Sequence, residues 1–283
     1  MKDLVWIDGR ILPAHEAHLP VYDRGFLYGD GIFETLRTYH GQIHALQPHL
    51  DRLQLSAEQI GLELRWSADE LAGILGELLQ AGGFPESYIR LMVTRGVGEF
   101  GLAPDLSEDQ RLIIINRPLQ PHPDTFWSGG VQAITVSQTG HRRGAQAKTS
   151  NYLPNLLALR LARQAGAHEA IRINGRDHVT EGSTSNVFIL RRGTLFTPDL
   201  AAGVLPGITR QLLIGIARDA DVPLIEAPIP AAWLHEATEI MLSSTLREIV
   251  SVVQLDGKKV GSGSPGSVSL ELLKRYRRLC GDA

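Results

Sequence analysis

Residues 147–154 read Ala-Lys-Thr-Ser-Asn-Tyr-Leu-Pro, and the rest of the chain is organised around this short polar stretch. We expect a strand that ends near Thr139 before it and a helix that begins near Pro154 after it. Lys148 is its only charged residue, and small hydroxyl and amide side chains follow it. A lysine attacks a carbonyl group when it is desolvated and held in place, and a connection between two regular elements can do both. The stretch therefore indicates a nucleophilic lysine, although a lysine in a loop is more often simply solvated.

Composition places the chain among soluble globular proteins. It has 283 residues, of which 43% are apolar and 21% charged, and this size favours two domains or one large one. The net charge of -3 gives no basic surface for nucleic acid. No apolar run is long enough to span a bilayer, and the start lacks the features of a signal peptide. Cys280 is the only cysteine, so we expect a cytoplasmic protein without an intrachain disulfide or a metal site.

The part of the chain before residue 120 alternates strands and helices. The patterns predict a hairpin over 5–12 that turns at Asp8-Gly9, strands over 32–39, 88–94 and 112–116, a helix after Pro48, and a helix opened by the capping box of residues 67–70. The segment from Arg117 to Pro123 is rich in proline and continues neither a strand nor a helix. We therefore predict an N-terminal domain over 1–119 and a C-terminal domain over 124–283.

The second half mixes helices and strands in the same way. Strands are predicted over 131–138, 170–174, 179–181, 186–190, 239–242 and 249–255, and helices over 154–165 and 206–220 and at the basic C-terminus. The helix after the lysine carries an apolar stripe of Leu153, Leu156, Leu157, Leu161 and Ala165, and Gly166 ends it. Mixed elements in two halves indicate an α/β (α+β) fold.

Pyridoxal phosphate is a cofactor that would use such a lysine. It needs an anchor for its phosphate, an acid beside its pyridine nitrogen, and a protein group that grips the substrate carboxylate. Gly207-Ile208-Thr209 opens a helix and Ser243-Ser244-Thr245 follows a strand, so both offer N–H and hydroxyl donors to a phosphate. Arg52 can pair with a phosphate, and Glu181 can face a pyridinium nitrogen. Taken alone, each residue is better explained as a solvated side chain or part of an ordinary turn.

Six motifs occur in a fixed order over nearly the whole chain. They are Asp23-Arg24-Gly25, Gly29-Asp30-Gly31-Ile32-Phe33-Glu34, His49-Leu50-Asp51-Arg52-Leu53, Lys148-Thr149-Ser150-Asn151-Tyr152, Thr180-Glu181-Gly182-Ser183-Thr184-Ser185-Asn186-Val187-Phe188 and Pro206-Gly207-Ile208-Thr209-Arg210. Together they resemble the class IV aminotransferases, the pyridoxal-phosphate enzymes of fold type IV. This family includes branched-chain aminotransferases, D-amino acid aminotransferases and aminodeoxychorismate lyases.

The resemblance implies a role for each of these motifs. Lys148 would form the Schiff base and move the proton, and Glu181 would contact the pyridine nitrogen. Tyr152 would hydrogen-bond the phenolic oxygen of the cofactor. The cofactor phosphate would be held by Arg52, Ile208, Thr209, Ser244 and Thr245. The resemblance also implies a smaller N-terminal α/β domain, a larger C-terminal mixed domain, and a homodimer with the active site near the subunit boundary.

The substrate motifs give mixed indications. Tyr88-Ile89-Arg90 resembles the strand by which branched-chain enzymes orient a carboxylate, and Phe33 matches their apolar pocket. The run from Glu181 to Phe188 is closer to the D-amino acid enzymes. Arg95 is a further substrate-binding candidate, but the residues after it lack both the basic residue of the D-enzymes and the Gly-Gly-Arg-Gly-Tyr run of the lyases. Leu246-Arg247 replaces small residues common in both transaminase branches, so we expect either the bulky Leu246 to narrow the substrate pocket or the charged Arg247 to change its charge.

We therefore predict a ping-pong aminotransferase that acts on hydrophobic, branched-chain L-amino acids and 2-oxoglutarate. The alternatives are a D-amino acid aminotransferase and a 4-amino-4-deoxychorismate lyase. A non-catalytic cofactor-binding protein on the same fold is a further possibility, and the complete set of lysine, glutamate and phosphate-binding groups argues against it.

Overall fold

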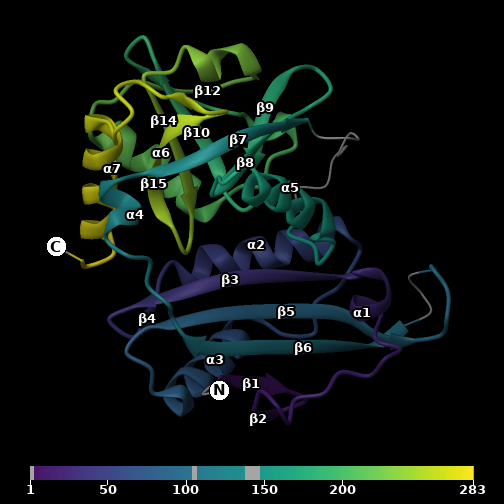
Figure 1. Cartoon of the computed structure of the whole chain (residues 1–283). Coiled ribbons are helices and arrows are strands. Elements are labelled where there is room, and N and C mark those ends of the chain that lie inside the picture. The colour runs from purple at the N-terminus through teal and green to yellow at the C-terminus, as the bar shows by residue number, and fades with distance from the viewer. Residues whose placement is uncertain (1–2, 104–106, 138–146, 283) are drawn as a thin grey trace. The chain divides into compact units, whose positions relative to one another are not determined.

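The computed structural model describes residues 3–103, 107–137 and 147–282 (Figure 1). By their contacts the residues form two compact units. The first comprises Met1–Pro121 and Ala147–Tyr152, and the second comprises His122–Gln146 and Leu153–Ala283. The segment that carries Lys148 therefore groups with the first unit, although the chain before and after it belongs to the second.

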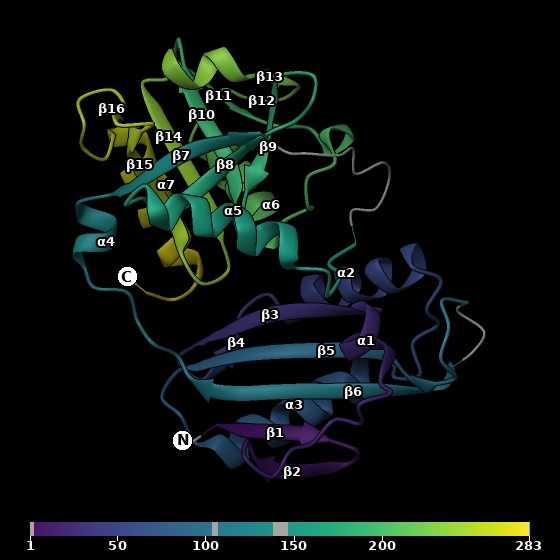
Figure 2. The same ribbon diagram turned by 45° about the vertical axis from the view of Figure 1, so that its right-hand side comes forward.

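The first unit is built on an antiparallel six-stranded sheet in the order β2-β1-β6-β5-β3-β4 (Figure 2). Its elements are β1 (Leu4–Ile7), β2 (Arg10–Pro13), α1 (Arg24–Tyr28), β3 (Gly31–Tyr39), β4 (Gln42–Ile43), α2 (Leu46–Gln59), α3 (Ala68–Gly82), β5 (Ser87–Gly98) and β6 (Ser107–Pro118). The predicted hairpin is confirmed, and Asp8 and Gly9 both have positive φ, 49° and 76°, as its two-residue turn requires.

Helices α2 and α3 pack on one face of this sheet. The capping box at the start of α3 is present as predicted, because Ser67 and Glu70 bond each other's backbone N–H groups. Leucines of both helices join apolar strand residues in one core, which includes Ile32, Leu36, Leu53, Leu75, Leu91 and Ile114. Side chains alternate along a strand, so Phe33 of β3 and its neighbours Arg90 and Tyr88 of β5 lie on the face away from these helices.

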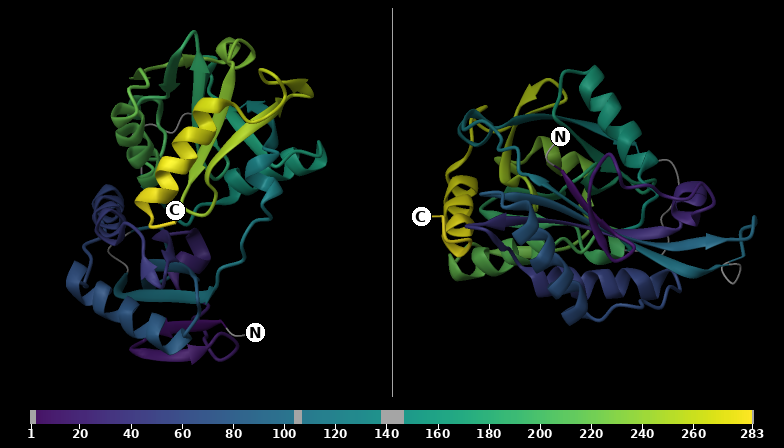
Figure 3. Two further views of the ribbon diagram at one scale, coloured as in Figure 1. Left: turned by 90° about the vertical axis from the view of Figure 1, so that its left-hand side faces the viewer. Right: turned by 90° about the horizontal axis from the view of Figure 1, so that it is seen from below.

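The second unit is built on a mixed sheet in the order β12-β11-β10-β14-β15-β7-β8-β9-β13, with β16 paired to β15. Its strands are β7 (Val131–Ser137), β8 (Glu169–Ile173), β9 (His178–Gly182), β10 (Asn186–Arg191), β11 (Thr194–Thr197), β12 (Leu224–Glu226), β13 (Ile229–Pro230), β14 (Glu239–Ser244), β15 (Glu248–Leu255) and β16 (Lys258–Lys259). Its helices are α4 (Thr125–Ser128), α5 (Leu153–Gln164), η2 (Leu200–Ala202), α6 (Ile208–Asp219), η3 (Ala231–His235) and α7 (Ser267–Leu279). Figure 3 shows the C-terminal helix α7, drawn in yellow, along the strands β14 and β15 that it contacts.

The α/β (α+β) prediction is confirmed by these two sheets and their helices. The sequence patterns missed several short elements, among them β11, β12, β13 and α4, and they differ from the structure in two further helices. Helix α1 was not predicted, because Asp23 caps a single turn inside a glycine-rich segment. Helix α5 buries its small residues Asn155, Ala158 and Ala162 rather than its leucine stripe. Strand β7 is described to Ser137, and the predicted strand end at Gln138 and Thr139 lies outside the described residues.

Candidate active site

Lys148 is held by its backbone along the edge of β3. The N–H of Phe33 donates to the carbonyl of Lys148 at 2.9 Å, and the N–H of Ser150 donates to the carbonyl of Gly31 at 2.9 Å. On its other side, the N–H of Lys148 donates to Oγ of Ser56 in α2 at 3.1 Å. The lysine therefore starts from a fixed backbone position and not from a loose loop, as a nucleophile requires.

The aromatic ring of Phe33 gathers three of the predicted site residues around it. Nζ of Lys148 lies 4.3 Å from the ring centroid, and Cζ of Arg90 lies 3.9 Å from it. The ring of Tyr152 meets that of Phe33 edge to face, with 5.4 Å between centroids. Cations are attracted to an aromatic ring, so both positive groups lie against the ring of Phe33. Such a pair of cations attracts an anion such as a carboxylate.

Arg90 is half-buried and has no acidic partner among the residues that the structure describes. In the described parts of the chain, its one hydrogen bond runs from Nε to Sδ of Met92 at 3.4 Å, and no carboxylate forms an ion pair with it. Tyr88 lies two residues before it on the same strand face, opposite Arg37 of β3. The structure therefore brings together Phe33, Tyr152, Lys148 and Arg90, with Tyr88 along the same face.

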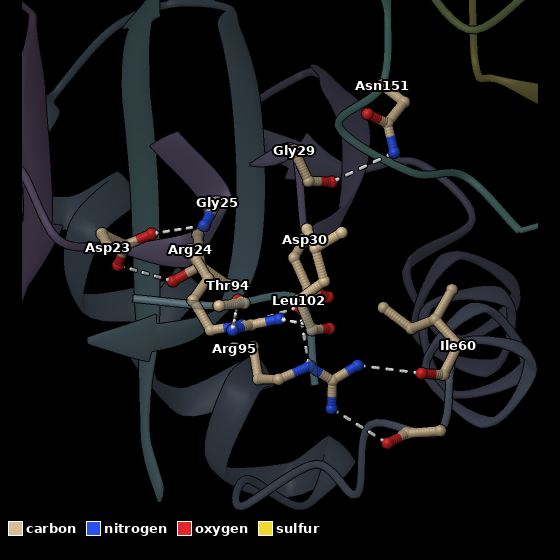
Figure 4. Close-up of polar contacts among 12 residues, drawn as sticks. Asp23, Arg24, Gly25, Gly29, Asp30, Ile60, Thr94, Arg95, Leu102 and Asn151 are labelled. Atoms are coloured by element: carbon tan, nitrogen blue, oxygen red, sulfur yellow. Dashed lines mark hydrogen bonds and ion pairs between the residues drawn. The ribbon is translucent and has the colours of Figure 1, made fainter. Parts of the chain in front are cut away.

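Arg95 has different surroundings, although it lies only five residues after Arg90. Its side chain is 7% exposed, and its Nε and that of Arg24 both donate to Oδ2 of Asp30, at 2.9 and 3.0 Å (Figure 4). The remaining guanidinium nitrogens of the two arginines donate to backbone carbonyls of Gly61, Ile60, Gly101 and Leu102. Arg95 thus ties β5 to the end of α2 and to the segment before β3, and the structure does not place it with Arg90 at the Phe33 ring.

Arg52 is buried on α2 and bound by two nitrogens to Glu34 of β3. Its Nε donates to Oε1 at 2.8 Å and its Nη2 donates to Oε2 at 2.6 Å, while the ring Nδ1 of His49 lies 2.7 Å from Oε2. Burial alone would raise the pKa of Glu34, but the charge and hydrogen bonds of Arg52, with His49, bring it down to about 2. Burial also lowers the pKa of His49, so its ring is neutral at pH 7. The guanidinium expected to hold a phosphate is therefore fixed in one orientation.

Glu34 and His49 were not assigned roles from the sequence. Two signals would have found them. Glu34 occupies a buried position of an alternating strand, where a lone acid is costly without a cation. His49 precedes Arg52 by one helical turn, so both side chains reach the same point.

In the second unit, Glu181 is the penultimate residue of β9, and its carboxylate is held at both oxygens. Nη2 of Arg172 donates to Oε1, and the N–H of Leu205 donates to Oε2 at 2.9 Å. Arg172 is 4% exposed and was missed from the sequence, although an arginine inside the apolar run of β8 is the signal that could have revealed it. The predicted glutamate is therefore an oriented, buried carboxylate and not an exposed turn residue.

The loop that bonds Glu181 leads directly into the start of α6. Gly207 caps this helix without a side-chain bond, so the first-turn N–H groups of Ile208 and Thr209 have no capping side chain. A Cβ on Gly207 would lie 2.0 Å from Oδ1 of Asn186, which leaves room for glycine alone. The Nδ2 of Asn186 donates to the carbonyl of Leu205 at 2.9 Å. An uncapped helix start with an adjacent hydroxyl is suited to bind a phosphate.

The predicted residues Ser244, Thr245 and Leu246 lie where β14 ends and the turn to β15 begins. Ser243 pairs in register with Asn186, and this pairing connects the turn to the strand that follows the Glu181 segment. Within the second unit, the structure thus connects Glu181, the start of α6 and this turn through Asn186.

These groups match the requirements of pyridoxal 5'-phosphate. The first unit by itself has a fixed lysine amine and a tyrosine, which suit an aldehyde and a phenolic oxygen, and a buried arginine, which suits a phosphate dianion. The second unit by itself has a carboxylate, which suits a pyridine nitrogen, and uncapped N–H donors with a hydroxyl, which suit a phosphate. Among the described residues, no group of three His, Cys, Asp or Glu side chains could hold a metal ion.

Comparisons with known proteins agree with this assignment. Residues 31–255 match the family described as amino-transferase class IV. The chain is 33% identical over 279 residues to a Methanocaldococcus jannaschii protein with the provisional name branched-chain-amino-acid aminotransferase, covering 96% of this chain and 95% of that protein. It is 32% identical over 274 residues to the D-alanine aminotransferase of Staphylococcus haemolyticus, covering 97% and 96%.

Two solved structures have similar folds, and one of them contains a derivative of the cofactor. The fold resembles the branched-chain aminotransferase from the archaeon Thermoproteus uzoniensis with norvaline, with a TM-score of 0.91, 33% identity and coverage of 99% of this chain and 95% of that one. Another branched-chain amino acid aminotransferase, complexed with N-(5'-phosphopyridoxyl)-L-glutamate, gives a TM-score of 0.90 at 27% identity, covering 99% and 95%.

Proposed function

Since the chain belongs to the class IV aminotransferases, which depend on pyridoxal 5'-phosphate, we propose that it moves an amino group between a hydrophobic, branched-chain L-amino acid and 2-oxoglutarate. Two domains over 1–119 and 124–283 remain our proposal for its organisation. The proposed substrate rests mainly on one observation. Arg90 is half-buried, has no acidic partner among the described residues, and lies with Lys148 at the Phe33 ring.

Arg90 and Phe33 together suit a substrate with a carboxylate at one end and an apolar side chain. An arginine pairs with a carboxylate through two parallel hydrogen bonds. Among the described residues, no carboxylate of the chain binds the guanidinium of Arg90. Phe33 is 1% exposed and offers an apolar wall on the same face. We propose that Tyr88 helps Arg90 to orient the carboxylate and that Leu246 limits the size of the side chain.

The roles of the remaining residues follow from their chemistry. When bound, the cofactor provides the carbonyl that accepts the amino group and a ring that withdraws electrons. We propose that Lys148 carries the proton between the substrate and the cofactor, because its backbone is fixed and its amine lies at the Phe33 ring. Glu181 keeps the ring nitrogen protonated, Tyr152 bonds the phenolic oxygen, and the phosphate is held by Arg52, Ile208, Thr209, Ser244 and Thr245.

The acceptor 2-oxoglutarate completes a balanced exchange. The amino acid leaves as a 2-oxo acid after giving up its amino group, and 2-oxoglutarate then takes that group and leaves as glutamate. The similar fold of the enzyme that was solved with a phosphopyridoxyl derivative of L-glutamate supports this choice.

A D-amino acid aminotransferase is the second candidate. It is favoured by the identity of 32% to a D-alanine aminotransferase and by the run from Glu181 to Phe188. The stereochemistry of the substrate separates the two candidates directly.

A homodimer is part of the proposal. Leu153, Leu156, Leu157 and Leu161 on α5 are each at least half exposed, at 64, 55, 50 and 51%. Large exposed apolar faces mark protein contact sites, and a second copy of the chain is the partner that the family resemblance implies. Light scattering of the purified protein should give twice the mass of the chain, and a monomer at micromolar concentration would contradict this part. None of the helices in the described residues is long and apolar enough to cross a membrane, and the cytoplasmic location expected from the sequence stays a proposal.

The experiment that tests the function is a spectral half-reaction. The holoenzyme is mixed with single amino acids without an oxo acid, and the absorption of the cofactor is followed. We expect L-leucine and L-isoleucine to convert the cofactor, and 2-oxoglutarate to restore it with formation of glutamate. Conversion by D-alanine or D-glutamate alone would select the second candidate, and no conversion by any branched-chain L-amino acid would exclude the first.

A further inference from the structure

Glu169, at the start of β8, is the most heavily bonded carboxylate in the described part of the second unit. Its side chain is fully buried. Oε1 accepts the N–H groups of Ala170 and Ser183, each at 2.9 Å, and the hydroxyl of Ser183. Oε2 accepts the hydroxyls of Thr184 at 3.2 Å and Ser185 at 3.1 Å. Three consecutive residues directly after Glu181-Gly182 are therefore attached to a single carboxylate.

The sixth donor to Glu169 is Arg247, from the turn between β14 and β15. Its Nη1 lies 2.6 Å from Oε2, and its side chain is 18% exposed. The sequence departs from the family pattern at this position, because a small residue is usual after the threonine in both transaminase branches. The charge of Arg247 is paired with Glu169, so this arginine is a partner of the Ser183–Ser185 segment and not an isolated cation.

Two hydrogen bonds from other elements hold the turn that carries Arg247. Nε1 of Trp127 donates to the carbonyl of Arg247 at 3.0 Å, and Nε of Arg277 donates to Oε2 of Glu248 at 2.7 Å. Glu248 has a φ of 58°, a left-handed conformation that residues other than glycine adopt at a cost of about 1 kcal/mol or more. Strained residues persist where their surroundings fix them, so the turn is held in one conformation.

Glu169 is charged when it makes these contacts. Burial alone would raise the pKa of its carboxyl, but the charge of Arg247, the hydroxyl of Ser183 and the N–H of Ala170 together lower it. The other titratable group at this point is His168, whose pKa is lowered by burial and by the charges of Arg163 and Arg247. At pH 7 the pair is therefore a carboxylate and a guanidinium beside a neutral imidazole.

We propose that Glu169 and Arg247 are positioning residues that fix the segment after Glu181 relative to the Ser243–Leu246 turn. The pair joins the carboxylate that faces the pyridine nitrogen to the turn that holds the phosphate, so it sets the separation of the two ends of the cofactor site in the second unit. This inference rests on the proposed roles of Glu181, Ser244 and Thr245.

Substitutions of Arg247 test whether this residue positions the Ser183–Ser185 segment without being required for folding. In Arg247→Met, Glu169 keeps five neutral donors, so the unit should fold while the turn loses its link to Ser183–Ser185. We expect the holoenzyme to release the cofactor about 10- to 100-fold faster, the range seen when partners that orient binding residues are removed. Arg247→Lys keeps one cationic donor and should restore the release rate to within about threefold, because a single charged hydrogen bond carries most of the effect.

A second readout does not depend on the cofactor. Hydrogen exchange followed by mass spectrometry should show faster exchange of amides in residues 182–186 in both Arg247→Met and Glu169→Gln. The matched control is Arg191→Met, which breaks an arginine–glutamate pair of the same unit whose glutamate, Glu236, is 49% exposed. The double variant Glu169→Gln with Arg247→Met should lose less free energy of unfolding than the sum of the losses in the two single variants, because both substitutions remove the same contact.

The outcomes are distinct. The proposal is overturned if Arg247→Met and Glu169→Gln leave both cofactor release and exchange of residues 182–186 as in the parent, or if the control variant has the same effect. Should the parent protein bind no pyridoxal 5'-phosphate at all, the proposed function fails. Exchange of residues 182–186 in Glu169→Gln and Arg247→Met would then decide alone whether the pair fixes that segment.

Discussion

Each unit of the protein has a fully buried glutamate beside residues of the candidate site, Glu34 in the first and Glu169 in the second, and the two carboxylates are satisfied differently. Glu34 in the first unit is bonded by Arg52 and by the ring of His49. Glu169 in the second unit is bonded by one arginine and by five hydroxyl and N–H groups. The carboxylate of Glu34 orients the side chain of Arg52, whereas the carboxylate of Glu169 holds the Ser183–Ser185 segment by hydrogen bonds. The first unit thus presents cations at fixed positions, and the second presents a carboxylate and neutral donors.

The largest effect should come from removing the amine of the first unit. Lys148→Ala deletes the group proposed to carry the proton, and we expect kcat to fall by at least about 10³- to 10⁴-fold, since proton transfer by a positioned side chain contributes about 10²- to 10⁴-fold alone. Steady-state assays with L-leucine and 2-oxoglutarate measure the loss. Lys274→Ala, which removes an exposed lysine of α7, is the control and should match the parent. Equal activity of Lys148→Ala and the parent would exclude this lysine.

Acid titration of stability tests the difference between the two carboxylates. The pKa of Glu34 is about 2 in the folded protein, below its ordinary value of 4.5, so its ionised form stabilises the fold above pH 4.5. This contribution should disappear as the pH falls from 4.5 towards about 2. Glu34→Gln leaves Arg52 without its anion and should lower the free energy of unfolding at pH 7 by about 3–5 kcal/mol.

Glu169→Gln provides the matched comparison in the second unit. Hydroxyl donors can rotate to accept a bond from an amide, so we expect a smaller loss of about 1–3 kcal/mol. Asp8→Asn, in the exposed pair with Arg111, should cost less than about 1 kcal/mol. Denaturant unfolding of the three variants gives the ranking, and a Glu34→Gln loss no larger than that of Glu169→Gln would contradict the distinction.

Removal of the charge of Glu181 should weaken the second unit's contribution to catalysis. A neutral amide cannot stabilise a protonated pyridine nitrogen, so Glu181→Gln should lower kcat by about 10²- to 10³-fold, the size of effect seen when one electrostatic contact to developing charge is lost. The absorption of the bound cofactor should shift as well. Glu236→Gln alters an exposed glutamate of the same unit and should leave both properties unchanged.

The smallest effect concerns two arginines of one strand. Arg90→Ala should raise KM for the amino acid by about 10- to 100-fold, as expected for a charged hydrogen bond worth about 1.5–3 kcal/mol, with little change in unfolding. Arg95→Ala should instead lower stability, because it removes one of the two arginine donors of Asp30 and the side-chain donor of two backbone carbonyls. If Arg95→Ala raised KM as much as Arg90→Ala without loss of stability, the separation of their roles would be wrong.

Much of the fold could be predicted because the local signals agreed with the final packing. The Asp8-Gly9 hairpin, the Ser67 capping box and the alternating strands each depend on neighbours in the sequence, and all are present. Helix α5 was harder, because apolar periodicity shows which residues share a face and not what covers that face. Its leucines are exposed within the single chain, while Ala158 and Ala162 pack inside it.

The candidate site shows the same contrast between local signals and contacts that depend on packing. Motif positions identified Lys148, Phe33, Arg90 and Tyr152, which meet at one ring. Contacts between residues far apart in sequence could not be inferred, such as that of Arg247 with Glu169. The two substrate arginine candidates looked alike in sequence, and the bonds of Arg95 to Asp30 and to the carbonyls after α2 separate it from Arg90.

The central claim is that Lys148 alone bonds covalently to pyridoxal 5'-phosphate, and borohydride reduction of the holoenzyme tests it most directly. Reduction makes the linkage permanent, and digestion followed by mass spectrometry locates the added phosphopyridoxyl group. The account predicts the group on Lys148. A label on Lys258, Lys259 or Lys274, or a protein without any label, would contradict it.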